Sequence, residues 1–160
     1  MRKVVILAQT EEGIEKAWDL IMDIENIFKL AKFVRKVSIK GPIKEGIEFY
    51  DVTGILWIPI PIKHKIIRIK KNEKFAMEAD LPLKSGKMFQ TLSVKDMGKV
   101  REIEMEIKYN IDFPVFDIIF SPILQYRLKQ MITETFRNIE SYINNQEGVM
   151  KTRFIAIIEK

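Results

Sequence analysis

The sequence predicts an α+β fold in which one antiparallel sheet has a single apolar face and a long helix covers that face. Three observations carry this prediction. Segments between about residues 34 and 111 alternate apolar and polar side chains with the period of two that strands have. Short polar turns separate these segments, as in an antiparallel meander. A long amphipathic segment, from about Val115 to Asn145, follows them.

The N-terminal part is predicted to form one strand and two short helices. Met1 to Ala8 is rich in β-branched residues, which favours a strand. Thr10 is the expected N-cap of the first helix, and a break near Asp23 to Asn26 separates it from the second. Apolar residues recur at helical spacing in both, at Ile14, Ala17, Trp18, Ile21 and Met22 and then at Ile27, Phe28, Leu30 and Ala31.

The later strands differ in how regular their alternation is. The strand from about Val100 to Ile111 is the clearest, and two others repeat its pattern with Phe75, Met77, Ala79 and Leu81 and with Met88, Gln90, Leu92 and Val94 on one face. The strands at Ile47–Trp57 and Ile62–Lys70 are less regular. The apolar parity of the second shifts at Ile66–Ile67, which predicts a β-bulge. The β-forming segment Phe154–Ile158 is expected to pair with a sheet edge of its own chain or of a neighbour.

Length and composition exclude several classes of protein. The 160 residues suit one domain, residues 1–146, followed by a C-terminal tail, 147–160. Cysteine is absent and His64 is the single histidine, so we expect no disulfide, no metal site and no cofactor. The longest uncharged apolar run, Gly54–Ile62, is about half the length of a membrane span, and a cytoplasmic location is expected. Abundant isoleucine and lysine are typical of a thermophilic source or of an AT-rich genome.

The net charge of +5 comes from lysines scattered among glutamates. The lysine-rich turns hold no aromatic residue with which nucleic-acid bases could stack, so no nucleic-acid partner is expected.

The connections between the predicted strands alternate between polar and apolar. Because alternate connections of a meander return to the same end of the sheet, one end gathers apolar residues. The connections at that end are expected at residues 28–33, 57–61, 81–83 and 113–116. Water-facing loops do not normally carry such residues, so this end needs an apolar partner, which is a ligand, a membrane, another protein or the core itself.

Several residues resemble a known family. The segment Lys16–Asp23, with its Trp18–Asp19 pair, resembles the opening of helix-grip proteins, the START and Bet v 1-like (SRPBCC) superfamily that includes polyketide cyclases and coenzyme Q-binding-like proteins. The glycine turn before Ile47–Tyr50 and the closing helix Leu124–Ile143 fit the same pattern. The resemblance covers about residues 1–146; the tail after Gly148 departs from it. It implies a curved antiparallel sheet of about seven strands wrapped around the long C-terminal helix.

The resemblance also implies an internal cavity for an apolar molecule, whose mouth lies where alternate loops meet the start of the long helix. We expect the ligand to contact residues of the apolar end and of the inward sheet and helix faces: Trp57, Ile60, Met77, Leu81, Met88, Gln90, Met105, Tyr109, Phe113, Phe116, Arg127, Met131 and Thr135. The alternative is that the loops fold inward, the methionines fill an irregular core and the polar groups bond to backbone or reach solvent.

For none of the candidate catalytic residues does the sequence predict a neighbouring group that would assist proton transfer. His64, Arg127 and Tyr142 are the candidates for proton transfer, but the sequence places no carboxylate beside His64, which is expected at the solvent edge. Asp51 and Glu78 are likewise unsupported as a catalytic pair.

The sequence therefore favours a non-enzymatic protein that binds or transports an apolar small molecule such as a lipid, isoprenoid or polyketide. Lysines beside the apolar end suggest transient contact with an anionic membrane surface: Lys29, Lys32, Lys63, Lys65, Lys84 and Lys87. A cyclase- or dehydratase-type enzyme and a protein-interaction module remain open as alternatives, and the chain is expected to be a monomer or a homodimer.

Overall fold

The computed structural model describes residues 1–31, 34–55, 58–81, 86–110 and 112, several positions between 126 and 141, and the backbone of 153–159. Within these residues the elements are β1 (Arg2–Thr10), α1 (Ile14–Met22), α2 (Ile24–Leu30), β2 (Val34–Ser38), β3 (Glu48–Ile55), β4 (Ile58–Lys70), β5 (Lys74–Asp80), β6 (Lys87–Asp96), β7 (Arg101–Tyr109) and β8 (Arg153–Glu159). The described positions between 126 and 141 are helical, as predicted. None of the described helices is long and apolar enough to cross a membrane.

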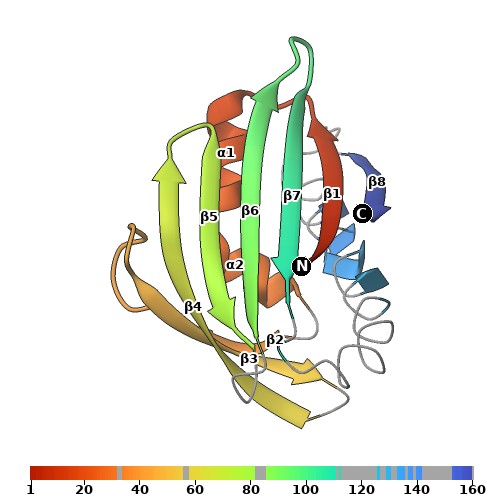
Figure 1. Cartoon of the computed structure of the whole chain (residues 1–160). Coiled ribbons are helices and arrows are strands. Elements are labelled where there is room, and N and C mark those ends of the chain that lie inside the picture. Colours follow the sequence, from red (N-terminus) through yellow and green to blue (C-terminus); the bar gives the residue numbers. More distant parts are fainter. Residues whose placement is uncertain are drawn as a thin grey trace.

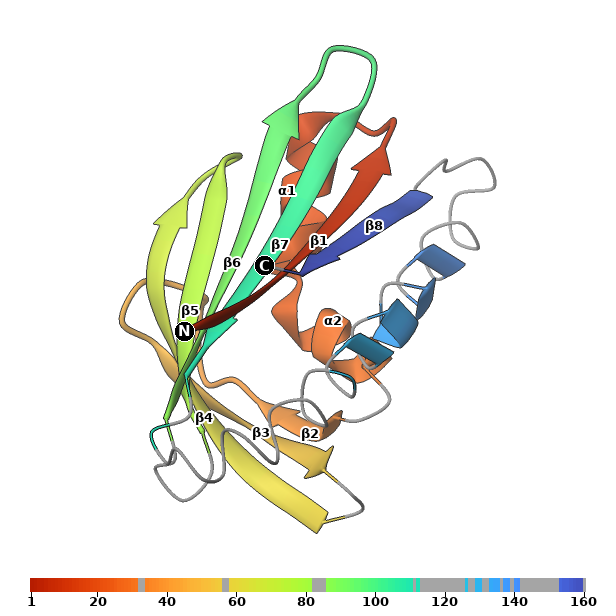
Figure 2. The ribbon, with the colours of Figure 1, turned by 45° about the vertical axis from the view of Figure 1, so that its right-hand side comes forward.

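The strands form one sheet in the order β2-β3-β4-β5-β6-β7-β1-β8, with every neighbouring pair antiparallel (Figure 1). The sheet is strongly curved, and α1, α2 and the described helical positions of the C-terminal part lie on its concave side (Figure 2). The predicted α+β architecture is thus confirmed, including the two short helices after the first strand.

Side chains on the concave face form two apolar clusters. The first joins α1 and α2 to one half of the sheet, with Trp18, Ile21 and Phe49 among its buried members. The second consists of strand residues nearer the other end: Val4, Ile6, Ile62, Ala79, Met88, Ile107 and Tyr109, against which Ile60, Leu81 and Met105 pack. The predicted alternation of β5, β6 and β7 is confirmed, because the inward residues of these strands are the members of the two clusters.

The bulge predicted at Ile66–Ile67 is confirmed. The register of β4 against β5 shifts between Ile66 and Arg68, and Ile67 is exposed. A bulge adds one residue to a single strand and increases its bend. Beyond the end of the β3–β4 pairing, Oε1 of Glu45 accepts a hydrogen bond from the backbone N–H of Ile69 at 2.7 Å, so this amide stays paired.

The connection predicted at residues 57–61 is mostly strand. β4 begins at Ile58, and Pro59 and Pro61 pair with Gly54 and Val52 of β3. Proline lacks the N–H that a central strand needs. Both prolines are tolerated because β4 pairs with β5 only from His64 onward, so among the described residues this part of β4 has a partner strand on one side alone.

The predicted N-cap at Thr10 is wrong. Thr10 is the last residue of β1, and α1 begins after Gly13, which has no side-chain cap. The hydroxyl group of Thr10 instead accepts a hydrogen bond from the backbone N–H of Glu12. The predicted break is confirmed, because α1 ends at Met22 and Asp23 caps α2 through the backbone N–H of Asn26.

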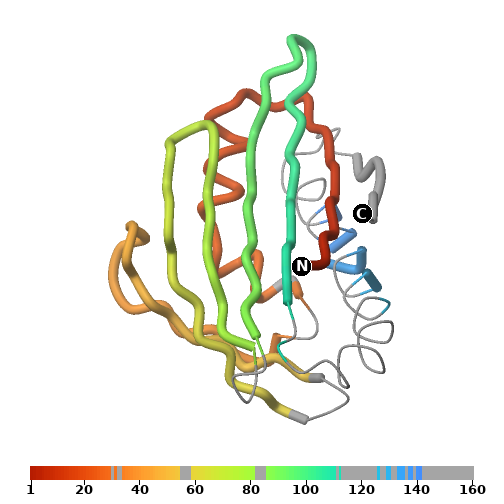
Figure 3. The backbone as a smooth tube through the Cα atoms, in the orientation of Figure 1, coloured from red at the N-terminus to blue at the C-terminus, as the bar shows by residue number. Residues whose placement is uncertain are grey.

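The C-terminal segment pairs with its own chain. β8 lies antiparallel to β1, from Val4 opposite Glu159 to Gln9 opposite Arg153, with an irregularity between Leu7 and Ala8. β1, red in Figure 3, therefore lies between β7 and β8 in the sheet. This pairing covers the edge of β1, which would otherwise expose unpaired backbone groups.

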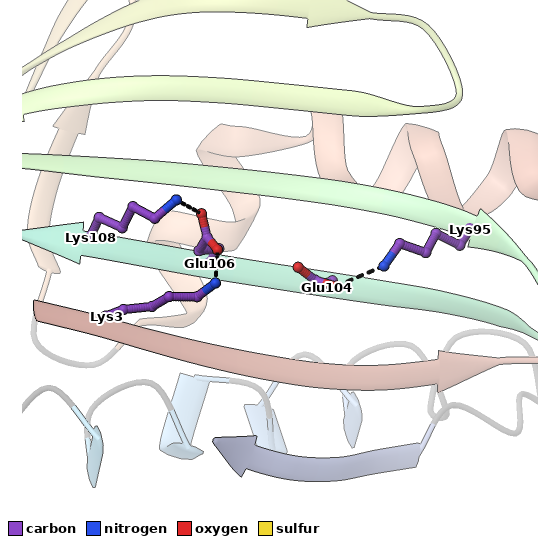
Figure 4. A network of polar contacts seen from close by, with 5 residues as sticks. All are labelled: Lys3, Lys95, Glu104, Glu106 and Lys108. Atoms are coloured by element: carbon purple, nitrogen blue, oxygen red, sulfur yellow. Dashed lines mark hydrogen bonds and ion pairs between the residues drawn. The ribbon is translucent and has the colours of Figure 1, made fainter. Parts of the chain in front are cut away.

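Ion pairs cross the convex face of β1, β6 and β7 (Figure 4). The carboxylate of Glu106 pairs with Lys3 of β1 and with Lys108, the latter at 2.5 Å, and Glu104 pairs with Lys95 of β6 at 2.8 Å. Burial alone would raise the pKa of Glu106, but the hydrogen bonds from Lys108 and Lys3 outweigh it and hold that pKa below the ordinary value. The pairs made by Lys3 and Lys95 bridge neighbouring strands, whereas the pair made by Lys108 lies within β7.

We predict that Glu106→Gln lowers the free energy of unfolding at neutral pH and that this loss shrinks as the solution becomes acidic. A carboxylate with a depressed folded-state pKa contributes stability above its unfolded pKa and loses it as pH falls through the folded value. Urea unfolding of both proteins at several pH values measures the difference. A gap between them that stays constant through the acid range would contradict the prediction.

Candidate functional site

Two adjacent strands place three polar side chains among apolar residues of the concave face. Asp51 and Thr53 of β3 and His64 of β4 are 2 %, 5 % and 2 % exposed. Asp51 and Thr53 alternate with outward residues in phase with Phe49, and the register pairs Phe49 with His64 and Asp51 with Ile62. A period of two therefore turns these polar groups toward the core together with their apolar neighbours.

Hydrogen bonds join the three side chains into one group. Nε2 of His64 lies 2.6 Å from Oδ2 of Asp51, and the hydroxyl of Thr53 donates to Oδ1 of Asp51 at 2.7 Å. With Asp51 as a carboxylate, which only accepts hydrogen bonds, Nε2 of His64 is the donor of this contact. The carboxylate thus has one donor on each oxygen.

Aromatic rings hold the imidazole in place. The ring of His64 stacks on that of Phe49, with centroids 4.8 Å apart and planes 10° from parallel. Phe28 of α2 meets both rings edge-on, at 5.4 Å from His64 and 5.7 Å from Phe49. Packing and the bond to Asp51 together fix the ring, while its other nitrogen, Nδ1, is buried with no hydrogen-bond partner in the described part of the chain.

The expectation that His64 sits at the solvent edge is therefore wrong. His64 is buried, and it does have a carboxylate partner. That partner is Asp51, which lies 13 positions earlier in the sequence. Glu78 does not join them: it pairs with Lys87 instead, at 3.7 Å. The sequence did contain one signal for this group: Asp51 and Thr53 lie at alternate positions from Phe49, so all three side chains point to the same face of β3. The sequence does not specify the register of β3 with β4, so it could not place His64 beside Asp51.

The structure brings part of the predicted ligand-contacting set together on the concave face. Met77, Met88 and Tyr109 are buried there, and Ile60, Leu81 and Met105 pack against the second cluster. Gln90 is half-buried, with its amide nitrogen 3.7 Å from the sulfur of Met88, and Thr135 is buried. The remaining predicted residues lie outside the described part of the chain: Trp57, Phe113, Phe116, Arg127, Met131 and Tyr142.

Several of the lysines predicted to surround the apolar end are engaged by glutamates. Lys29 pairs with Glu25 at 2.9 Å, Lys63 with Glu48 at 2.8 Å and Lys87 with Glu78. The hydrogen bond between Lys63 and Glu48 raises the pKa of the lysine and lowers that of the glutamate. These partners reduce the positive charge that an anionic surface would meet at the described lysines.

Metal binding has no support among the described residues, where no group of three or more His, Asp or Glu side chains is placed to hold an ion. The polar group of Asp51, Thr53 and His64 can instead bind, donate or accept a proton.

Neither a protein-family model nor a curated protein matches the sequence. Solved structures do match the fold. A START superfamily protein from Mycobacterium smegmatis has 11 % identity and a TM-score of 0.70, with 91 % of this chain and 99 % of that chain covered. Norcoclaurine synthase from Thalictrum flavum, in complex with dopamine and hydroxybenzaldehyde, has 16 % identity and a TM-score of 0.68, with 92 % and 89 % covered.

The di-domain ARO/CYC protein StfQ of the steffimycin biosynthetic pathway matches with 9 % identity and a TM-score of 0.72, over 92 % of this chain and 53 % of that one. At these identities the likeness concerns the fold alone. The chain has the helix-grip fold of START and Bet v 1-like proteins, as the resemblance of Lys16–Asp23 implied.

We predict that Asp51→Ala lowers the free energy of unfolding by about 3 kcal/mol, because it strands the buried Nε2 of His64 and the hydroxyl of Thr53. Glu48→Ala is the matched control, since Glu48 lies on the same strand but in an exposed pair with Lys63. Solvent screens exposed ion pairs, so the free energy of unfolding should fall much less in the control than in Asp51→Ala. Equal losses in the two variants, measured by urea unfolding, would show that the buried group does not contribute as described.

Proposed function

We propose that the protein binds an apolar small molecule against the concave face of the sheet. One observation carries the proposal: that face combines a broad apolar surface with a buried, internally hydrogen-bonded polar group, Asp51, Thr53 and His64. Small-molecule sites have this composition, with apolar walls and a few fixed polar atoms that orient the ligand.

The division of the core supports this location. Among the side chains that the structure describes, α1 and α2 contribute to the first cluster but not to the second, whose members come from strands and from Leu81. The buried inward side chains of Ile62, Ala79 and Met88 therefore belong to a cluster that holds no described side chain of these two helices. Methionines at Met77, Met88 and Met105 suit such a surface, because their flexible side chains adapt to different shapes.

The fold neighbours support the same class of function. A norcoclaurine synthase solved with dopamine and hydroxybenzaldehyde and an ARO/CYC protein of a biosynthetic pathway share this fold. Fold alone does not fix function, so the proposal for this chain is the binding of an apolar or aromatic molecule, of the lipid, isoprenoid or polyketide kind.

Gently purified protein, analysed by native mass spectrometry and then by organic extraction, is expected to carry or take up an apolar molecule.

Ile60→Glu should weaken binding of an added apolar fluorophore by about tenfold or more, because it places a charge against the second apolar cluster. Ile67→Glu is the control: it is the same change on the same strand, but Ile67 is exposed. A protein that neither retains nor binds any apolar ligand, with or without liposomes present, would refute the proposal.

Acid–base catalysis in the same place is the second candidate, favoured by the 2.6 Å contact between His64 and Asp51. A carboxylate that fixes the tautomer and orientation of a histidine prepares that histidine to accept a proton from a substrate. If His64 acts as the base, His64→Gln would abolish turnover of a cyclase or dehydratase substrate.

A ligand-free dimer that buries the apolar end would instead favour the alternative that the protein is a protein-interaction module.

A further inference from the structure

We propose that Nδ1 of His64 is the polar recognition atom of this surface and accepts a hydrogen bond from a hydroxyl group on the apolar ligand. The proposal rests on the proposed function and narrows it to ligands that carry a hydroxyl donor, either a phenol or a long-chain alcohol.

The first step of the argument is the tautomer of the imidazole. The bond to Asp51 keeps a proton on Nε2, and a neutral imidazole then has a bare lone pair on Nδ1, which is an acceptor. The two nitrogens point in divergent directions, so Nδ1 faces away from the carboxylate. Among the described residues nothing bonds to Nδ1, although the side chain is 98 % buried.

The second step is the cost of this arrangement. A buried polar atom without a partner destabilises the fold, and native proteins pair nearly all such atoms. Replacement of the whole polar group by apolar residues would remove that cost. In this protein, by contrast, Asp51 and Thr53 are present, and Asp51 orients His64. Nδ1 of that histidine makes no hydrogen bond within the described chain.

The third step is what lies on the other flank of the imidazole. While β3 supplies Asp51 on one side of β4, the residue of β5 paired directly with His64 is Ala79. Its methyl group has no hydrogen-bonding atom and is among the smallest side chains of the second cluster. Met77, Leu81 and Met88 continue the apolar surface around it, so a ligand there meets hydrocarbon on most sides and Nδ1 as its acceptor.

The tautomer is directly measurable, because His64 is the single histidine of the chain. In a protein labelled with ¹⁵N-histidine, NMR is expected to show one imidazole with its proton on Nε2. In Asp51→Asn, if Thr53 keeps donating to Oδ1, the amide nitrogen faces Nε2 and the proton moves to Nδ1. A wild-type imidazole protonated on Nδ1, with or without a proton on Nε2, would overturn the proposal, since Nδ1 would then not be an acceptor.

Recognition is tested with two probe pairs in which a methyl group replaces the donor proton: 2-naphthol against 2-methoxynaphthalene, and farnesol against farnesyl methyl ether. The wild type should bind the hydroxyl member of at least one pair about tenfold more tightly, the usual effect of one well-placed hydrogen bond. The pair that shows the preference identifies the ligand as a phenol or as a long-chain alcohol.

The control is a variant that replaces the polar group with apolar side chains, Asp51→Leu, Thr53→Val and His64→Phe together, since single changes leave a buried partner unpaired. It should bind both members of each pair with a ratio near one, and Asp51→Asn should also lose the preference.

Equal binding of both members by the wild type overturns this proposal and leaves the proposed function standing. Binding of neither pair, nor of any other apolar probe, overturns both. A preference that persists in the triple variant shows that another group recognises the hydroxyl and also overturns the proposal.

Discussion

The register between β3 and β4 is the constraint on which the concave face depends. It sets Phe49 opposite His64 and Asp51 opposite Ile62. A strand has a side-chain period of two, so a slip of one residue in β3 would turn Asp51 and Thr53 outward and bring Tyr50 and Val52 inside. The apolar side chains of the same two strands hold this register, and the hydrogen bonds among Asp51, Thr53 and His64 form only within it.

Curvature then decides what the register encloses. The bulge at Ile66–Arg68 bends β4 just beyond its pairing with β3, where it pairs with β5, and the sheet curves toward the helices (Figure 2). α1 and α2 pack against one half of the concave face through Trp18, Ile21 and Phe28. The other half is lined by strand residues, so the same sheet serves as a packed core at one end and as the candidate binding surface at the other.

In our proposal, the buried group of Asp51, Thr53 and His64 makes this surface selective for ligands that donate a hydrogen bond. Apolar walls attract many molecules with little discrimination, whereas one fixed acceptor distinguishes ligands by a single proton. Ring stacking on Phe49 and the edge of Phe28 restrict the imidazole, so little entropy is lost when a ligand bonds to it. The convex face has the opposite character, with lysine–glutamate pairs between strands and within β7.

The sequence by itself determined the element order, the alternation of β5 to β7, the helix break at Asp23 and the bulge in β4, because each of these follows from local periodicity and turn chemistry. Only the tertiary structure decided the bond between His64 and Asp51, the start of β4 at Ile58 and the pairing of β8 with β1 of its own chain. Each of these depends on register or contact between segments distant in the chain. Local patterns carry no information about which residue faces which across two strands, so a histidine expected near solvent lies at the centre of the site.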